Sequence, residues 1–233
     1  MPFTKWMEKH LKKEQNMKCD KKDLLLYAVT DRTWLKGETL TDAVEKALIG
    51  GVTFVQLREK ALEIEQFLKE AKEIKALCQK YHVPFVINDN IDIAIAADAD
   101  GVHVGQRDME AGHVRNLIGQ DKILGVSVQT VDQAILAEKQ GASYLGVGAV
   151  FYTGSKTDAD DVSHETLKEI CQSVKIPVVA IGGIHEGNVM ELSRLGLCGI
   201  AVISAIFAQP DIIKATESLK KLTEKMVQER PHG

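Results

Sequence analysis

The sequence predicts a single α/β domain of the (βα)8, or TIM, barrel class, preceded by an N-terminal lead-in helix. Eight short runs rich in Val, Ile and Leu alternate with helical patterns along the chain. The runs lack a strict apolar–polar alternation, as expected for parallel strands that are buried on both faces. Polar residues follow most of these runs, and a barrel of this class builds its active site at the ends of its strands. The length of 233 residues is also typical of one such barrel.

The order of the elements supports a barrel more than a doubly wound sheet, although one strand fewer would leave that choice open. Small residues precede several strands at intervals of roughly 40–55 residues, which is a faint internal repeat of the kind a chain of βα units produces. Helices are expected between the strands, for example over residues 64–79 and 131–140. The expected strands are residues 24–30, 53–58, 84–89, 101–105, 123–128, 144–150, 177–182 and 199–204.

No composition break divides the chain, so residues 23–233 are expected to form one catalytic domain. Residues 1–22 are a lysine-rich lead-in segment without the apolar core of a secretory signal. Phe3, Trp6, Met7 and Leu11 lie near helical spacing, which predicts an amphipathic helix that caps the closed end of the barrel or a frayed tail. Its apolar face would also suit a subunit contact, so a homo-oligomer is left open.

The bulk composition narrows the classes of function. The chain is 45% hydrophobic and 27% charged with a net charge of −4, so nothing favours nucleic acid or an anionic membrane as a partner. No apolar stretch approaches the roughly 20 residues of a membrane-spanning helix. The four cysteines are far apart and form no C-x-x-C pair, which argues against structural zinc and disulfides and favours a reducing cytoplasm. Small-molecule substrates are the expected partners.

Two carboxylates follow neighbouring strands. Asp89 ends the third expected strand and Asp108 follows the fourth. Adjacent strands lie about 5 Å apart, so the two side chains could share one ion, and Mg²⁺ is usually held by one or two carboxylates, with phosphates and waters. Each aspartate taken alone also fits an N-cap of the following helix. Because cations are predicted nearby, one magnesium ion is the preferred interpretation.

Three cations are expected to face the same end of the barrel. Arg58 and Lys60 follow the second strand, and Lys156 lies in the loop after the sixth. Arg binds phosphate oxygens in a bidentate manner and Lys acts as a mobile point charge, so together with magnesium they would balance a diphosphate.

A second anion site is expected after the seventh and eighth strands, where Gly182-Gly183 and Ser204 lie. These loops commonly bind phosphate in barrels, and glycine lets the backbone approach the anion closely. A glycine pair alone would more often be a tight turn, but its position favours a monophosphate site.

No general base is evident in the sequence. His103 lies within an expected strand and could point into the barrel or pack outside it, and a structural histidine with satisfied hydrogen bonds is the favoured interpretation. No Ser-His-Asp set and no G-x-S-x-G motif can be assembled. A reaction driven by departure of a leaving group fits such a site.

Taken together, the polar segments resemble the thiamine phosphate synthase family, which joins a pyrimidine diphosphate to a thiazole phosphate. The resemblance spans residues 24–225 in the family order. Several of its motifs are weak alone, whereas the ordered set is specific. The matching segments are residues 26–31, 51–60, 88–89, 99–108, 125–127, 153–156, 181–184 and 202–204.

The resemblance implies a transferase with a dissociative mechanism, in which pyrophosphate leaves and the thiazole nitrogen attacks a pyrimidine methylene cation. Asp89 and Asp108 would hold the magnesium ion. Catalytic roles are expected for Arg58, Lys60, Lys156 and Ser127. Gln56, Asn88 and Ser127 would contact the aminopyrimidine or its diphosphate. Thr153, Ser155, Gly183, Ile203 and Ser204 would bind the thiazole phosphate, and Leu57, Glu59 and Gly154 are expected to contact substrate within the matched segments.

The sequence departs from the family pattern in the loop after the sixth strand. Ala149 stands where proline is usual, and Ser155 replaces a typical threonine. Residues 157–161 are unusually acidic. The first two changes are expected to alter loop stiffness more than chemistry.

Three other functions are less consistent with the sequence. The thiazole tautomerase branch of the fold lacks the magnesium aspartate after the third strand, so Asp89 with Asp108 argues against it. A metal-dependent sugar-phosphate epimerase needs a His/Asp metal set at the strand ends, which the sequence does not supply. A non-catalytic barrel that binds phosphate ligands would not be expected to keep every charged motif.

Overall fold

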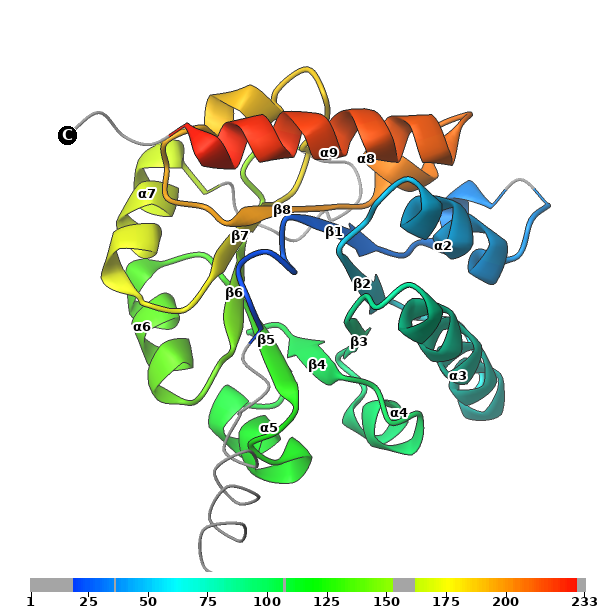
Figure 1. Cartoon of the computed structure of the whole chain (residues 1–233). Helices are drawn as coiled ribbons and strands as arrows, with labels where there is room; N and C mark the ends of the chain where they lie inside the picture. Colours follow the sequence, from blue (N-terminus) through cyan, green and yellow to red (C-terminus); the bar gives the residue numbers. More distant parts are fainter. Residues whose placement is uncertain (1–18, 36, 107, 153–161, 230–233) are drawn as a thin grey trace, which may run out of the picture.

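The computed structural model describes residues 19–35, 37–106, 108–152 and 162–229. Its centre is a closed barrel of eight parallel strands in sequence order, which confirms the predicted fold class (Figure 1). The strands are β1 (Leu26–Val29), β2 (Phe54–Leu57), β3 (Phe85–Asn88), β4 (Gly101–Val104), β5 (Ile123–Val128), β6 (Tyr144–Val147), β7 (Val178–Ile181) and β8 (Gly199–Val202).

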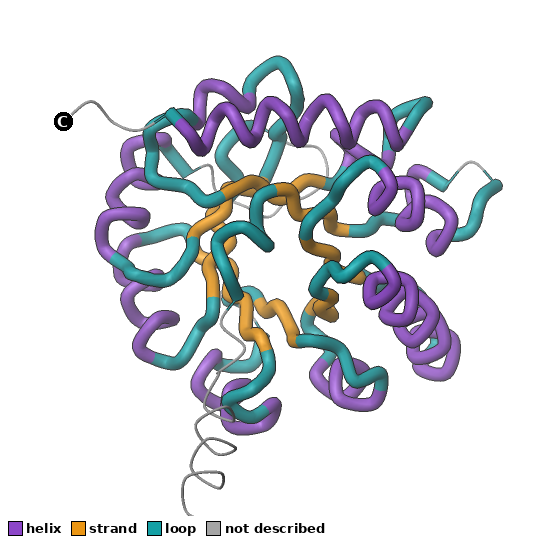
Figure 2. Tube along the Cα trace, viewed as in Figure 1, coloured by secondary structure: helices purple, strands orange, loops and turns teal. Residues whose placement is uncertain are grey.

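Helices surround the strands as an outer ring (Figure 2). They are α2 (Leu40–Ile49), α3 (Ile64–Lys80), α4 (Ile91–Ala96), α5 (Ala111–Ile118), α6 (Val131–Lys139), α7 (His164–Ser173), α8 (Ser204–Phe207) and α9 (Ile212–Gln228), with 3-10 turns η1 (Arg32–Trp34) and η2 (Val189–Leu192). The connection from β7 to β8 carries η2 in place of a regular α-helix. The long α9 packs against α2 and β8, so the end of the described chain closes the ring next to its first helix.

Most strands are shorter than the apolar runs that predicted them. The run over residues 144–150 forms a ladder only as far as Val147, and Val150 then donates its N–H to Ile181 O at 3.1 Å. The residues beyond the ladder become the loops at the carboxyl end of the barrel. An apolar run marks burial, and burial continues for a few residues after the strand pairing has ended.

Two apolar clusters hold the barrel together. Successive side chains of a strand point to opposite faces, so Val55 and Leu57 of β2 join a large outer cluster between strands and helices. Phe54 of the same strand joins a smaller inner cluster inside the barrel. Tyr27, Phe54 and Tyr144 meet edge to face there, with ring centroids 4.6–5.9 Å apart. The barrel is therefore a packed interior with side chains from alternating positions.

Two buried cations reinforce the amino-terminal end of the barrel. Lys75 of α3 lies 2.5 Å from Asp100, whose other carboxylate oxygen accepts the N–H of Phe85 at 2.8 Å. Arg115 of α5 donates to the carbonyl oxygens of Gly119, Lys122 and Gly141 and to the Ser143 hydroxyl. These contacts join the helix layer to the starts of the strands, at the end of the barrel opposite the carboxyl ends of the strands.

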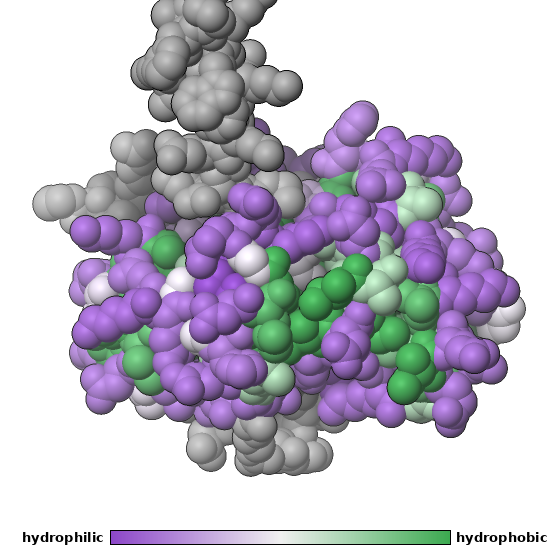
Figure 3. All heavy atoms as spheres, turned by 90° about the horizontal axis from the view of Figure 1, so that it is seen from below, coloured by the Kyte–Doolittle hydropathy of each residue, from purple (hydrophilic) through white to green (hydrophobic). Residues whose placement is uncertain are grey.

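The outer surface is mostly polar, with an apolar area on the face shown in Figure 3. Ile95 of α4 and Leu117 of α5 are 55% and 48% exposed.

A homo-oligomer stays a prediction. The predicted lead-in helix lies outside the described residues. No helix in the described part of the chain is long and apolar enough to span a membrane.

Candidate active site

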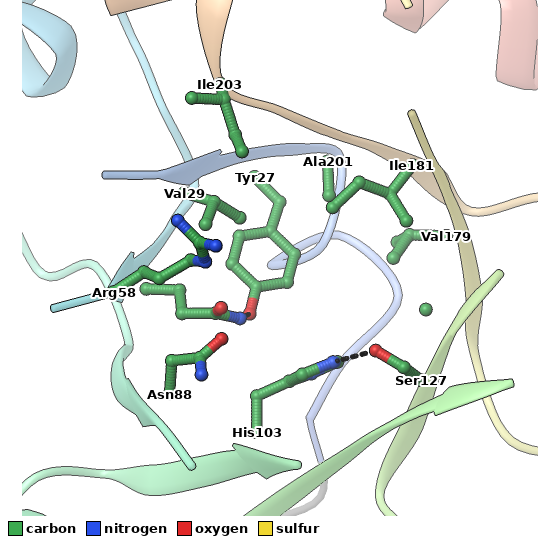
Figure 4. Close-up of a pocket in the computed structure, with 12 residues that line it drawn as sticks. Tyr27, Val29, Arg58, Asn88, His103, Ser127, Val179, Ile181, Ala201 and Ile203 are labelled. Carbon is green, nitrogen blue, oxygen red and sulfur yellow. Dashed lines mark hydrogen bonds between the residues drawn. The ribbon is translucent and has the colours of Figure 1, made fainter. Parts of the chain in front are cut away.

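A pocket opens at the carboxyl ends of the strands, where the sequence predicted the site (Figure 4). It holds about 400 Å³ of space, part of which is open to solvent. Five of the predicted site residues line it: Gln56, Arg58, Asn88, Ser127 and Ile203. The other lining residues are Tyr27, Val29, His103, Gly146, Val179, Ile181 and Ala201.

Arg58 brings a cation to this pocket from the end of β2. Its backbone is held in place, because the Arg58 N–H donates to the Thr30 hydroxyl at 3.0 Å. Its guanidinium lies 3.8 Å from the Asp31 carboxylate, a distance at the outer limit of an ion pair. The guanidinium side chain is 13% exposed. It is therefore positioned at the pocket with donors that can still bind an incoming anion.

The side chains of Leu57 and Glu59 do not line the pocket, and their expected contacts with substrate stay a prediction. Leu57 is fully buried in the outer cluster, since its side chain points away from the barrel interior. Glu59 is bound by Arg32, and its other oxygen accepts the backbone N–H groups of Lys60 at 2.9 Å and Ala61 at 3.1 Å. Both residues thus hold the loop that carries Arg58 and the exposed Lys60.

The carboxylate of Glu59 is kept ionised by these contacts. Its burial alone would raise the pKa, but the hydrogen bonds from Arg32, Ala61 and Lys60 outweigh burial and leave the pKa below its usual value. Arg32 also binds Glu70 of α3, whose pKa is raised because burial outweighs its single bond to the guanidinium. The three side chains tie the Arg58 loop to the helix that follows it.

The two predicted magnesium ligands lie on neighbouring loops. Asp89 follows β3 with φ of 61° and donates its N–H to His103 O at 2.8 Å. Asp108 follows β4 and accepts the Gly105 N–H at 2.6 Å. Neither aspartate caps the next helix, because Asn90 caps α4 and Glu110 is the N-cap residue of α5, without a side-chain cap hydrogen bond. The capping alternative is therefore wrong for both residues.

These two carboxylates suit a magnesium ion that is also bound by substrate. Both are exposed and both offer hard oxygen ligands, of which magnesium needs one or two from the protein when phosphates and water complete the shell. No group of three or more His, Cys, Asp or Glu side chains arranged for a metal occurs among the described residues. Two carboxylates leave positions in an octahedral shell for phosphate oxygens and waters.

The glycine pair after β7 packs against the loop after β6. Gly182 and Gly183 have φ of 103° and 65°. A Cβ on Gly183 would lie 2.5 Å from Tyr152 O, and one on Gly182 would lie 2.6 Å from Ala149 Cα, so only glycine allows this approach. Ser204 is the first residue of the four-residue α8. The pair brings the two loops into contact, and its predicted role in phosphate binding stays a prediction.

Four predicted residues, Thr153, Gly154, Ser155 and Lys156, lie outside the described residues. So do Asp158, Asp160 and Asp161 of the acidic stretch. The assignments of the thiazole-phosphate loop and of the third cation therefore stay predictions.

His103 points into the barrel, which decides between its two expected placements. Its Nδ1 lies 2.9 Å from the Tyr144 hydroxyl and its Nε2 lies 2.9 Å from the Ser127 hydroxyl, so the expectation of a satisfied histidine is confirmed (Figure 4). Tyr27 and Tyr144 take part in the same interior contacts and were missed from the sequence, where both read as apolar strand positions. Burial raises the pKa of both phenols above their usual value, so they stay protonated.

The sequence pattern of the family described as thiamine monophosphate synthase matches residues 26–206 of this chain. The thiamine-phosphate synthase of Clostridium tetani is 53% identical over 197 residues, which are 84% of this chain and 94% of that protein. The enzyme of the same name from Clostridium botulinum (strain Eklund 17B) is 47% identical over 207 residues, 89% of this chain and 97% of its own.

A solved structure gives the same result in three dimensions. Thiamine phosphate pyrophosphorylase from Pyrococcus furiosus superimposes with a TM-score of 0.82 at 42% identity, covering 89% of this chain and 98% of that one. The pattern match, the sequence identity and the barrel geometry agree over nearly the same residues. The chain belongs to the thiamine monophosphate synthase family.

Proposed function

We propose that this protein is a transferase that condenses 4-amino-2-methyl-5-(diphosphooxymethyl)pyrimidine with 4-methyl-5-(2-phosphooxyethyl)thiazole, giving thiamine phosphate and pyrophosphate. The observation that carries the proposal is the identity of about half the residues with thiamine-phosphate synthases over almost their whole length. The pocket supports it, because Gln56, Arg58, Asn88 and Ser127 converge there at the strand ends. The tautomerase alternative is not favoured, because both aspartates are retained at the loops after β3 and β4.

The chemistry explains why the site needs cations and no base. The bond between the pyrimidine methylene carbon and the diphosphate oxygen breaks, and its electron pair leaves with pyrophosphate. The thiazole nitrogen then forms the new bond with its own lone pair. This nitrogen carries no hydrogen, so bond formation releases no proton that a general base would have to accept. The main task of the protein is therefore to stabilise the departing negative charge.

The described residues supply that stabilisation from one side of the pocket. Arg58 would grip the diphosphate oxygens, because its guanidinium lies at the pocket with only a long contact to Asp31. Lys60 follows on the same loop as an exposed point charge, and Lys156 is proposed as the third cation. Asp89 and Asp108 would hold one magnesium ion, which would add positive charge beside the diphosphate.

The thiazole phosphate is proposed to bind where the loops after β6, β7 and β8 meet. Gly183, Ile203 and Ser204 lie on two of these loops, and Thr153 and Ser155 belong to the third.

The proposed function is tested by pyrophosphate release from purified protein. Release is expected only when both substrates and magnesium are present, and it should stop with EDTA. Arg58→Ala should lose most of the release, whereas Tyr81→Phe, which removes a hydroxyl bonded to Glu45 on the outer surface, should keep it. Isomerisation of a thiazole carboxylate without pyrophosphate release would contradict the proposal and indicate the tautomerase reaction.

A further inference from the structure

The barrel interior contains a continuous hydrogen-bonded chain that joins opposite sides of the pocket. Gln56 Nε2 on β2 donates to the Tyr27 hydroxyl on β1, and Tyr27 is bonded to the Tyr144 hydroxyl on β6 at 2.8 Å. Tyr144 contacts His103 Nδ1 on β4 at 2.9 Å, and His103 Nε2 contacts the Ser127 hydroxyl on β5 at 2.9 Å. We call these five residues the interior chain. Both of its ends, Gln56 and Ser127, line the pocket.

Glycines on two strands make room for the interior chain. A Cβ on Gly125 would lie 2.3 Å from the Tyr144 ring and hydroxyl and 2.4 Å from His103 Nδ1. A Cβ on Gly146 would lie 3.3 Å from His103 Cε1. The bare backbone at these two positions allows the tyrosine and the histidine to meet inside the barrel.

Burial makes the contacts of the chain obligatory. Gln56, Tyr27, His103 and Tyr144 are 4%, 1%, 8% and 0% exposed. Water therefore cannot substitute for a lost partner at the two phenols, and an unpaired polar atom in such a place is costly. The bonds of the chain must be satisfied together.

The amide of Gln56 sets the direction of every bond in the chain. An amide nitrogen only donates, so the Tyr27 oxygen accepts from Gln56 and Tyr27 donates its hydrogen to Tyr144. Tyr144 in turn donates to His103 Nδ1, which must be the unprotonated ring nitrogen. The proton of the neutral imidazole then lies on Nε2 and is donated to Ser127.

This direction fixes what the pocket offers to a ligand. With its nitrogen turned toward Tyr27, the Gln56 amide holds its carbonyl oxygen on its other side as a fixed acceptor. Because the Ser127 oxygen already accepts from His103, its own hydrogen is left to donate. An aminopyrimidine has the complementary groups, since its exocyclic amine can donate to the Gln56 carbonyl and a ring nitrogen can accept from Ser127. A 4-oxopyrimidine presents an acceptor in place of the amine, so it would face the Gln56 carbonyl unless that amide turned and the chain reversed.

We propose that Tyr27, Tyr144 and His103 are positioning residues that select the 4-amino over the 4-oxo pyrimidine by holding Gln56 as acceptor and Ser127 as donor. This inference rests on the proposed function, because it concerns the pyrimidine substrate of that reaction. The three residues act through the two ends of the chain. A site built to match hydrogen-bonding groups rejects a mismatched analogue far better than an apolar pocket does.

The first test compares the two pyrimidine diphosphates as substrates. The native protein is expected to prefer the 4-amino compound by about 10⁴-fold in kcat/KM. Tyr144→Phe removes the central hydroxyl, so each half of the chain can reorient independently, and the preference should fall at least about tenfold. The KM for the thiazole phosphate should stay unchanged. Tyr81→Phe is the matched control and should keep the native preference.

An unchanged preference in a folded Tyr144→Phe protein would overturn the proposal. If that variant does not fold, the second test decides it on the native protein. NMR of protein with ¹⁵N-labelled histidine should show His103 as the neutral Nε2–H tautomer, and an Nδ1–H tautomer would overturn the proposed direction.

The tautomer does not depend on turnover, so the two proposals can fail separately. A protein that releases no pyrophosphate contradicts the proposed function. Active protein with the wrong tautomer contradicts only the role of the interior chain.

Discussion

Replacing Arg32 by methionine is expected to loosen the loop that carries Arg58 and Lys60 without touching the pocket. The guanidinium binds Glu59 and Glu70, and Glu59 in turn holds the N–H groups of Lys60 and Ala61. Methionine keeps the apolar stem of the side chain and removes both of its hydrogen bonds. The side chain of Glu59 is only 4% exposed, so its charge would keep just the two backbone donors.

The magnitude follows from the exposure of the two partners. A hydrogen bond to a charged group contributes about 1.5–3 kcal/mol to the free energy of unfolding. Because the Arg32 side chain is 35% exposed, solvent screens its ion pair with Glu59. We therefore expect Arg32→Met to lower the free energy of unfolding by about 1–2 kcal/mol. For a chain of this size that corresponds to a fall in Tm of about 2–8 °C. The KM for the pyrimidine diphosphate should rise several-fold, and the KM for the thiazole phosphate should not.

The stability difference should depend on pH with a defined sign. The pKa of Glu59 lies below its unfolded value, so its contribution is present above the unfolded pKa and is lost as the pH falls through the folded pKa. Arg32 also favours the ionised form of Glu70, although burial leaves that pKa raised overall. The gap in stability between the native protein and Arg32→Met should therefore narrow as the pH falls below about 4.5.

Thermal unfolding across pH and steady-state kinetics at neutral pH measure these effects. Lys46→Met is the matched control, because it breaks an exposed pair with Glu38 that should contribute little. A Tm for Arg32→Met equal to that of the control, together with native kinetics, would refute the reasoning.

Three further changes test other parts of the structure. Asp89→Asn should abolish magnesium-dependent pyrophosphate release while leaving Tm nearly unchanged, because asparagine tolerates the left-handed backbone at this position; full activity would remove it from the metal site. Gly125→Ala should destabilise the protein by at least about 1–3 kcal/mol in denaturant unfolding, since its Cβ would overlap Tyr144, and native stability would contradict the packing described. Lys75→Met should lower the free energy of unfolding by about 2–4 kcal/mol in the same measurement, because Asp100 loses its buried partner. The kcat at saturating substrate should stay native. A selective loss of kcat would contradict a purely structural role.

The barrel could be predicted because burial on both faces leaves a plain mark in the sequence. Runs such as Phe85-Val86-Ile87 are apolar at every position, and eight largely apolar runs alternate with helices. The ends of the strands could not be predicted as well, since residues beyond the last ladder bond stay buried. Val150 is an example, being 6% exposed outside β6.

The site was predictable where polar residues end apolar runs. Gln56, Arg58, Asn88 and Ser127 all line the pocket as expected. The role of Glu59 could not be predicted, because its partner Arg32 comes from a different loop and nothing local marks the pair.

Tyr27 and Tyr144 were missed for a related reason. In a strand buried on both faces, the sequence does not reveal which alternate residues point into the barrel. The glycine at position 125, whose missing side chain makes room for Tyr144, becomes meaningful only when the strands are placed side by side.

The polar contacts at the amino-terminal end of the barrel have a consequence for redesign. Lys75 with Asp100, and Arg115 with its carbonyl partners, join helices to strands without using any residue of the pocket. The contacts that stabilise this end of the barrel are thus independent of the side chains that line the pocket. Libraries that randomise the loops at the opposite end, for example to accept another benzylic-type diphosphate, should retain a high fraction of folded members.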